Sequence, residues 1–412
     1  MVPEGWIYTT FEKHLDCLTG FAFKSSRYSS EDDGIRLLRG DNIEPGSLRW
    51  RDAKSWPKSE LDGLERYQLQ EGDFVIALDR TWISSGLKVA EVKTGDLPCL
   101  LVQRVARVRA KDSLEQTLLR QYFSGHRFEQ YVKSVQTATA VPHISPNDVK
   151  EFTVLLPPLP EQKNISQILS TWDQAITATE RLLENSQKRK KGLMQQLLTG
   201  KKRLPGFEEE WEKVRLGSIF SRVTSRNEGQ STNVVTISGQ QGLIRQQEFF
   251  KKSIASETLD NYFLLEKGQF AYNKSYSNGY PMGAIKRLNR YDDGVVTTLY
   301  ICFELTDGHA ADSDFYEQYF ESGLLNPGLM QVAHEGGRAH GLLNVKPSDF
   351  FSLTIHKPDI SEQKAIANVL CIADSEIDAQ KARLEQLRSE KRALMQQLLT
   401  GKRRVNVDRE AA

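Results

Sequence analysis

The sequence predicts an α+β protein with an internal repeat, in which two mixed helix and strand domains are each followed by a long helix. The main observation is that residues 161–201 return as residues 362–402, offset by 201 positions with no insertion or deletion. Both copies begin Glu-Gln-Lys and end Leu-Met-Gln-Gln-Leu-Leu-Thr-Gly-Lys. The second observation is that each copy follows about 145 residues of dissimilar sequence. Two half-molecules in tandem imply a structure with pseudo-two-fold symmetry, and such structures usually bind a target that also has two parts.

The repeated stretch has the pattern of a coiled-coil helix. Its seam positions alternate steps of four and three, and a 3.5-residue period over more than four heptads predicts a coiled coil. Pro160-Glu161 and Ser361-Glu362 are helix-start signals, and Thr-Gly followed by basic residues ends each copy. A helix of ~39 residues would be about 58 Å long. The predicted seam residues are Ile165, Leu169, Trp172, Ile176, Leu183, Leu193 and Leu197 in the first copy, and Ile366, Leu370, Ile377, Leu384, Leu387, Leu394 and Leu398 in the second.

Polar residues interrupt the seam at the same places in both copies. Thr179 and Gln380 occupy one of these positions, and Lys190 and Lys391 occupy another. Such residues typically specify the register or orientation of a coiled coil. Alternatively, the two lysines extend out of the groove at a frayed helix end. We expect the two helices to pair with each other, and an antiparallel pairing would place the two domains at opposite ends, related by a two-fold axis.

The two dissimilar segments, residues 6–146 and 211–347, share landmarks. Gly72-Asp73-Phe74 matches Gly268-Gln269-Phe270, and each glycine precedes an apolar, strand-like run. Alternation at 102–108 also predicts a strand, and short helices are expected near 115–133 and 312–322. A shared scaffold with divergent loops is typical of two recognition modules with different targets. The predicted domains are a first domain (1–146), a linker with the first long helix (147–205), a second domain (206–347), and a linker with the second long helix and a tail (348–412).

The composition is that of an ordinary globular protein. The chain has 412 residues, 39% hydrophobic residues and a net charge of +1, and no apolar run approaches the ~18–20 residues of a membrane helix. The start of the chain lacks the basic and apolar parts of a signal peptide. Four scattered cysteines without a C-x-x-C pair favour a reducing cytosol over zinc or disulfides. A DNA-binding chain with this net charge would concentrate basic residues locally or share phosphate contacts with a partner.

The helical repeats, together with residues 19–24 (Thr-Gly-Phe-Ala-Phe-Lys) and 39–43 (Arg-Gly-Asp-Asn-Ile), resemble the DNA-specificity subunit of a Type I restriction–modification enzyme. Residues 101–104 (Leu-Val-Gln-Arg) are similar to a further landmark of that family. The likeness covers the whole chain in the order domain, helix, domain, helix. The second domain departs from it, because residues 221–224 (Ser-Arg-Val-Thr) do not reproduce the Gly-Phe-Ala-Phe-Lys of the first.

The resemblance implies a function for each part of the chain. Each domain would be a target-recognition domain that reads one half of a bipartite double-stranded DNA site. The helices would form an antiparallel coiled coil that sets the spacer and docks two methyltransferase subunits. The chain itself would be non-catalytic, without cofactor or metal, in the cytoplasm of a bacterium or archaeon and away from membranes. Its partners would carry S-adenosylmethionine-dependent adenine methylation and, in the restriction subunits, ATP-driven translocation with cleavage.

The residues themselves indicate no catalytic centre. The sequence has no G-x-x-x-x-G-K-[ST] loop and no N-P-P-[YF] tetrapeptide. Only His334 and His340 lie near one another among the histidines, which favours loop polarity or a DNA contact over a metal site. Acidic pairs such as Asp292-Asp293 are typical of turns. Two other functions remain: a coiled-coil scaffold whose globular domains bind proteins, and a self-sufficient restriction–methylation enzyme, which would need the missing methyltransferase motifs.

The best candidates for reading DNA are the polar loops that follow the two glycine-started strands, at 79–88 and 273–280. The alternative is that these are ordinary solvated hairpin loops. Basic residues at 188–191 and 201–203 could meet phosphates, but a solvated helix end or a methyltransferase-docking surface is favoured. The candidate DNA-binding residues are Lys24, Arg27, Arg39, Asn42, Arg80, Thr81, Trp82, Ser84 and Lys88 in the first domain, and Arg222, Asn227, Lys274, Ser275, Tyr276, Asn278, Tyr280, Arg338 and His340 in the second.

Overall fold

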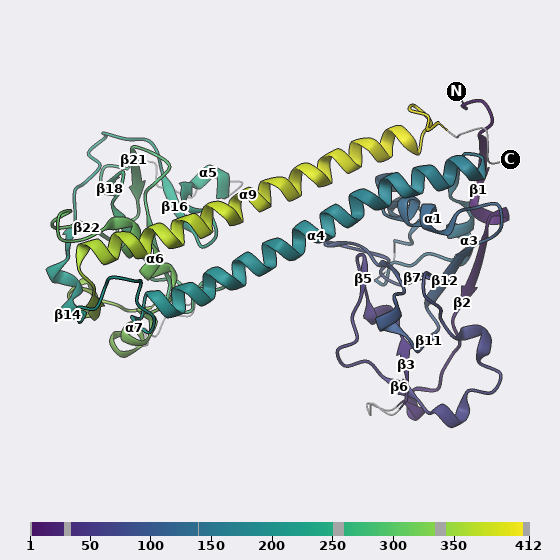
Figure 1. Ribbon diagram of the computed structural model, residues 1–412, viewed down its shortest axis with the longest axis horizontal. Coiled ribbons are helices and arrows are strands. Elements are labelled where there is room, and N and C mark those ends of the chain that lie inside the picture. Colours follow the sequence, from purple (N-terminus) through teal and green to yellow (C-terminus); the bar gives the residue numbers. More distant parts are fainter. Residues whose placement is uncertain (1, 29–33, 139, 250–258, 334–342, 407–412) are drawn as a thin grey trace. The chain divides into compact units, whose positions relative to one another are not determined.

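The computed structural model describes residues 2–28, 34–138, 140–249, 259–333 and 343–406. The chain forms two compact units. Unit 1 consists of residues 1–180 and 382–412, and unit 2 consists of residues 181–381. Both long helices have 39 residues, α4 (Leu159–Leu197) and α9 (Ile360–Leu398), and each contributes one stretch to each unit (Figure 1). Their lengths agree with the prediction from the repeat.

Unit 1 is built on a four-stranded antiparallel sheet in the order β10-β7-β12-β2. A smaller sheet has the order β11-β3-β6, with β11 and β3 parallel. The remaining strands form the pairs β1-β13, β4-β5 and β8-β9. The strands are β1 (Ile7–Thr10), β2 (Leu15–Thr19), β3 (Ile35–Leu38), β4 (Ile43–Glu44), β5 (Ser47–Leu48), β6 (Ser55–Trp56), β7 (Phe74–Ala77), β8 (Trp82–Ile83), β9 (Gly86–Leu87), β10 (Val89–Glu91), β11 (Cys99–Leu101), β12 (Val105–Ala110) and β13 (Thr153–Leu156).

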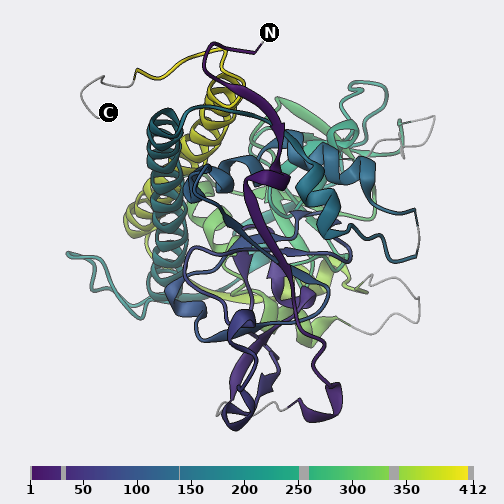
Figure 2. The same cartoon turned by 90° about the vertical axis from the view of Figure 1, so that its right-hand side faces the viewer.

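Helices cover one face of the large sheet and join it to the long helices. They are α1 (Gln116–Phe123), α2 (His126–Val135) and α3 (Pro146–Glu151). The core contains Phe11, Phe123 and Phe128, and it continues without a break into Leu169 of α4 and Leu398 of α9. In Figure 2, where unit 1 faces the viewer, the first turns of α4 lie beside the last turns of α9. These helix turns therefore belong to the hydrophobic core of the unit.

Unit 2 repeats this arrangement. Its four-stranded antiparallel sheet has the order β15-β22-β19-β20, and its other strands form the pairs β14-β23, β16-β17 and β18-β21. The strands are β14 (Glu212–Arg215), β15 (Phe220–Val223), β16 (Val235–Ser238), β17 (Gly242–Arg245), β18 (Phe263–Glu266), β19 (Phe270–Asn273), β20 (Ala284–Arg287), β21 (Asp293–Val296), β22 (Ile301–Leu305) and β23 (Thr354–Lys357). The helices are α5 (Gln246–Phe249), α6 (Ser313–Glu321), α7 (Asn326–Val332) and α8 (Pro347–Ser352). The core joins Phe220 and Phe303 to Leu197 of α4 and Leu370 of α9.

The two sheets share one topology. Read from their opposite ends, β2-β12-β7-β10 and β15-β22-β19-β20 follow the same order, and every pairing within them is antiparallel. The predicted α+β class is confirmed, and the strands after Gly72 and Gly268 are present as β7 and β19. Among the residues that the structure describes, no helix is both long and apolar enough to cross a membrane.

Two details differ from the sequence expectations. The strand expected at 102–108 begins only at Val105, because Gln103 and Arg104 form a turn. The helix expected near 115–133 is two helices, with a break at Ser124 and Gly125. The two compact units meet in the middle of each long helix, because the helix ends pack into the globular cores. The division of the chain into two domains and two segments of linker and long helix stays a prediction.

Candidate nucleic-acid interface

In unit 1, two turns meet at one edge of the large sheet. Ala77, the last residue of β7, pairs with Val105, the first residue of β12. The turn after β7 and the turn before β12 therefore lie side by side, and Leu78 N donates to Arg104 O at 2.9 Å. Arg80 and Arg104 are both exposed, and their φ angles are 48° and 72°. Such left-handed backbone is uncommon for residues other than glycine, and it persists where neighbouring contacts hold it.

Buried hydrogen bonds hold the turn after β7. The Thr81 hydroxyl is fully buried and donates to Ala77 O at 2.6 Å and to Leu78 O at 3.1 Å. Thr81 is therefore corrected from a candidate DNA contact to a structural residue, since a satisfied and buried hydroxyl is not available to DNA. The ring of Trp82, on β8, lies 4.3 Å from Lys133 Nζ, and Ser84 is exposed in the turn between β8 and β9.

The structure brings the segment around Arg39 to the same edge. A Cβ on Gly40 would lie 3.8 Å from Ala77 Cβ and 4.0 Å from Lys88 Nζ. Burial lowers the pKa of Lys88, and nearby Arg80 lowers it further, while Asp41 and Asp79 act in the opposite direction. Arg39 Nη2 lies 3.3 Å from Asp41 Oδ2. Arg39, Arg80, Lys88 and Arg104 thus gather at one edge although they are far apart in the sequence.

Asn42 is a second correction in unit 1. Its side chain is buried, its Oδ1 accepts from Arg39 N at 3.0 Å, and its Nδ2 donates to Arg49 O at 3.1 Å. It holds the turn and presents no free amide. Lys24 and Arg27 lie beside the small hydrophobic cluster that contains Phe23 and Trp56. Arg27 is tied there by an ion pair with Glu60 and by its position 5.1 Å above the Trp56 ring.

Unit 2 has the corresponding edge at the end of β19 and the start of β22. Tyr276, after β19, is 63% exposed, and Leu299, before β22, is 59% exposed. Asn278 is exposed, and Ser275 N donates to Asn273 Oδ1 at 3.1 Å. Lys274 is half-buried, and burial lowers its pKa, with a further contribution from Arg222 on β15. Lys274, Ser275, Tyr276 and Arg222 therefore share this part of the unit.

Two candidates in unit 2 make hydrogen bonds within the unit, and the buried Asn227 is corrected to a structural residue. Asn227 is fully buried, its Nδ2 donates to Ser231 O at 2.9 Å, and its Oδ1 accepts from Ser231 N at 2.9 Å. The Tyr280 hydroxyl donates to Gly239 O at 2.7 Å and accepts from the buried Lys286 Nζ at 2.9 Å. The Tyr280 hydroxyl therefore links the loop after β19 to the β16–β17 hairpin. Arg338 and His340 lie outside the described residues.

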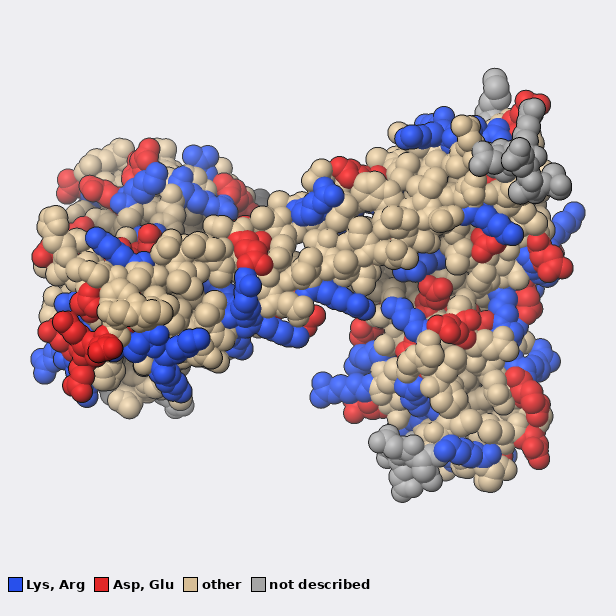
Figure 3. Space-filling model, viewed as in Figure 1, with Lys and Arg blue, Asp and Glu red and all other residues tan. Residues whose placement is uncertain are grey.

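The basic stretches at the end of α4 are largely engaged in ion pairs. Lys188 pairs with Glu184, and Arg189 pairs with Glu376. Lys190 and Arg203 each lie 2.6 Å from a carboxylate of α9. On the face that Figure 3 shows, lysines and arginines are interspersed with acidic residues over both units, in keeping with the net charge of +1.

The beginning of each long helix is held by the same set of contacts. In unit 1, the buried carboxylate of Glu161 accepts from Trp6 Nε1 at 2.9 Å and from Arg404 Nε at 2.8 Å. In unit 2, the buried Glu362 accepts from Trp211 Nε1 at 2.9 Å and from Arg203 Nε at 2.6 Å. Each network links the start of a globular part, the start of one long helix and the chain that follows the other.

The seam lysines also have partners. Lys391 Nζ lies 2.6 Å from Asp173 Oδ1 in unit 1, and Lys190 Nζ lies 2.6 Å from Asp374 Oδ1 in unit 2. A glutamine from the globular part donates to each aspartate, from Gln121 at 2.8 Å and from Gln318 at 2.7 Å. Of the two alternatives left open by the sequence, pairing across the helices therefore describes these lysines better than extension into solvent.

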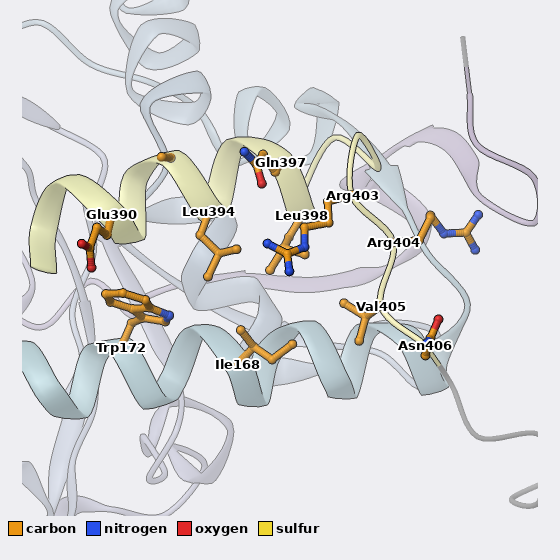
Figure 4. A pocket seen from close by; sticks show the side chains of 11 residues that line it. Ile168, Trp172, Glu390, Leu394, Gln397, Leu398, Arg403, Arg404, Val405 and Asn406 are labelled. Carbon is orange, nitrogen blue, oxygen red and sulfur yellow. The ribbon is translucent and has the colours of Figure 1, made fainter.

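All the predicted seam residues are buried or half-buried. Between the two helices of unit 1 lies a groove of about 650 Å³ (Figure 4). Ile168 and Trp172 of α4 face Leu394 and Leu398 of α9 across it, and Val405 lies at its end.

A second kind of groove is present in both units, and the same positions of the repeat line both copies. We call these the repeat grooves. The groove of unit 1, about 400 Å³, is lined by Arg392, Met395, Gln396 and Thr400, and that of unit 2, about 700 Å³, by Lys191, Met194, Gln195 and Thr199.

The fold and these contacts define a class of protein with two similar α+β parts, each joined to the same pair of long helices. Comparison with known proteins shows what the chain is similar to. Residues 34–185 match the Type I restriction modification DNA specificity domain. Over 188 residues the chain is 36% identical to the Type I restriction enzyme EcoAI specificity subunit of Escherichia coli. The aligned stretch covers 44% of this chain and 30% of that protein.

A second relative is the MjaVIII specificity subunit of Methanocaldococcus jannaschii, 29% identical over 204 residues, or 49% of this chain and 48% of that protein. The matched stretch thus spans less than half the length of either relative. The fold is also that of the Type I restriction–modification S subunit from M. genitalium, with a TM-score of 0.58 and 12% identity over 97% of this chain and 96% of that one. The resemblance of the chain to Type I restriction–modification specificity subunits is confirmed.

Proposed function

We propose that this chain is the sequence-specific DNA-recognition subunit of a Type I restriction–modification complex, and that each globular part reads one half of a bipartite site. The observation that carries the proposal is the shared sheet topology of the two units, whose corresponding edges present different residues. A common scaffold with different surface chemistry suits two half-sites of different sequence, because base edges are distinguished by the side chains that reach them.

The long helices set the separation of the two readers in this proposal, as an antiparallel coiled coil with a pseudo-two-fold axis. The ion pairs support this direction. From Asp173 to Lys190 the residue number on α4 rises by 17, while the partner on α9 falls by 17, from Lys391 to Asp374. The buried seam residues and the matching contacts of Glu161 and Glu362 add to it.

The spacer role has a direct test. Inserting one heptad after Leu183 and one after Leu384 should lengthen the spacer of the recognised site, or abolish recognition, while each half-sequence stays the same. An insertion that changed the half-sequences would contradict the role of the helices as spacers.

The repeat grooves are the proposed docking sites for two methyltransferase subunits. Gln195 and Gln396 are exposed and identical in the two copies, whereas many exposed positions earlier in the helices differ, as at Leu182 and Arg383. Packing within a unit does not explain identity at an exposed position, but two copies of one partner protein would. The restriction subunits would join through this complex, in the cytoplasm, and the chain itself would need no cofactor.

The chain is non-catalytic in this proposal, and the methyltransferase subunits carry the chemistry. The decisive experiment is footprinting of the chain together with its methyltransferase subunit on DNA. We expect two short protected segments separated by a fixed unprotected spacer. The absence of sequence-selective protection would favour the alternative, a coiled-coil scaffold whose globular parts bind proteins. Methyl transfer by the purified chain alone would overturn the non-catalytic role.

A further inference from the structure

The two sheet edges place different chemistry at equivalent positions. Phe74 and Phe270 begin β7 and β19, so Arg80 corresponds to Tyr276, six residues later in each unit. On the neighbouring strand, Val105 pairs with Ala77 in unit 1, and Ile301 pairs with Tyr272 in unit 2. Ala77 is the fourth residue of β7, whereas Tyr272 is the third residue of β19, so Val105 corresponds to the residue before Ile301. Arg104 therefore corresponds to Leu299. One edge thus exposes two arginines, and the other exposes a tyrosine and a leucine.

The arginine edge is held in place before any ligand binds. Leu78 N donates to Arg104 O, and Arg80 N donates to Pro142 O at 2.7 Å, so both left-handed turns are fixed by the backbone. The side chains are less constrained than the backbone. Arg104 Nε is 3.8 Å from Asp79 Oδ2, which is a loose ion pair at the surface. Among the described residues, Arg80 has no ion-pair partner.

The chemistry of the two edges suits different bases. A guanidinium donates two parallel hydrogen bonds to O6 and N7 of guanine in the major groove, the commonest specific contact of arginine with DNA. Leucine has no donor, and its apolar surface suits the methyl group of thymine. The exposed tyrosine of the same sheet edge adds a ring that can pack on a base or a methyl group.

We propose that Arg80 and Arg104 read guanine in the half-site recognised by unit 1, and that Tyr276 and Leu299 form the equivalent, apolar reading position for a thymine methyl in the half-site of unit 2. This inference rests on the proposed function, since it assigns base chemistry to the two halves of the site. It adds Arg104 and Leu299 to the candidates that the sequence indicated.

Glycine substitutions test the arginines without disturbing the backbone. Glycine adopts positive φ freely, so Arg104→Gly and Arg80→Gly remove the guanidinium and keep the turn. Asp52→Gly is the matched control, because Asp52 is exposed and has a φ of 59° away from this edge. Each variant of the full chain is assembled with the methyltransferase subunits, and bound sequences are selected from DNA randomised at both half-sites.

We expect Arg104→Gly and Arg80→Gly each to weaken binding of the cognate site by about 5- to 150-fold and to remove a guanine preference at one position of one half-site. Leu299→Ala should relax a thymine preference in the other half only, and Asp52→Gly should change neither. Retention of every guanine preference in the arginine variants would overturn the inference, as would an equal loss of affinity for all sequences, which would indicate phosphate contacts. If the unaltered complex selects no bipartite site, the proposed function fails instead.

Discussion

Lys190 Nζ, on α4, donates to both carboxylate oxygens of Asp374, on α9, at 2.6 and 2.7 Å. In unit 1, with the two helices exchanged, Lys391 Nζ donates to Asp173 Oδ1 at 2.6 Å. The lysine side chains are only 13% and 11% exposed, so each charge has a defined partner within the seam. A polar residue in such a seam restricts the helices to the register in which it is satisfied.

Charge exchange should measure this coupling. We expect Lys190→Asp and Asp374→Lys each to destabilise unit 2, because each places like charges together, and the double variant to recover about 1 kcal/mol of the combined loss. The estimate is modest because the Asp374 side chain is 40% exposed. Urea unfolding of the four proteins gives the coupling energy. Additive losses would show that the pair does not restrict the register.

Breaking the contact between Glu362 and Arg203 should cost more. Glu362 is fully buried, and it accepts from both Arg203 and Trp211. Loss of one partner of a buried ion pair costs about 3–5 kcal/mol, and we expect about 2 kcal/mol for Glu362→Gln because the Arg203 side chain is 25% exposed. Glu184→Gln, at the exposed pair with Lys188, is the control and should leave the urea midpoint unchanged. Equal midpoints for both variants would contradict this prediction.

The Glu161 carboxyl should contribute to the pH dependence of stability. Burial alone would raise its pKa, but the hydrogen bonds from Arg404 and Trp6 outweigh burial, and the net pKa is lowered. A carboxyl with a lowered folded-state pKa stabilises the protein above its unfolded pKa of about 4.3, and this contribution is lost as the pH falls through the folded pKa.

Glu161→Gln should therefore lose less stability than the unaltered chain as the pH falls below about 4.3. The measurement is the free energy of unfolding by urea from about pH 6 to about pH 3. Glu12→Gln, at an exposed position of the same unit, is the control. A constant difference between Glu161→Gln and the unaltered chain across this range would exclude the linkage.

A methyl group at Gly20 should disturb the sheet edge that carries Arg104. A Cβ on Gly20 would lie 2.3 Å from the carbonyl atoms of Val102, and the backbone cannot move aside cheaply. We expect Gly20→Ala to destabilise unit 1 by about 1–3 kcal/mol, the usual effect of overpacking. Gly95→Ala is the control, because nothing lies within 4 Å of a Cβ at that position. Thermal unfolding of both variants would show whether the close approach matters.

Exchange of residues 80–88 for the loop of another specificity subunit should alter one half of the recognised site. The loop lies entirely within unit 1, where Lys88 N donates to Thr81 O at 2.7 Å and the Thr81 hydroxyl anchors the turn. Thr81 and Lys88 should be kept so that the turn survives. Mapping of methylated adenines before and after the exchange tests this, and a change in both halves would contradict the separate reading of half-sites.

Much of the architecture follows from patterns close together in the sequence. The heptad spacing and the matching start and end signals predict two helices of equal length, because helix formation depends on neighbours within a few turns. Gly72 and Gly268 mark the strands β7 and β19 in the same way. Trp6 and Trp211, the first residues of the two dissimilar segments, have equivalent contacts in the structure, since each indole donates to the buried glutamate that begins a long helix.

The sequence by itself determined the repeat, the α+β class, the two long helices and the resemblance to specificity subunits. Only the tertiary structure decided which polar side chains are exposed. Thr81 and Asn227 look like DNA contacts in the sequence, but their hydrogen-bond capacity is used inside the units. Arg104 was hidden within a predicted strand, although its turn meets that of Arg80. The physical reason is that exposure depends on contacts between residues distant along the chain, which local spacing does not encode.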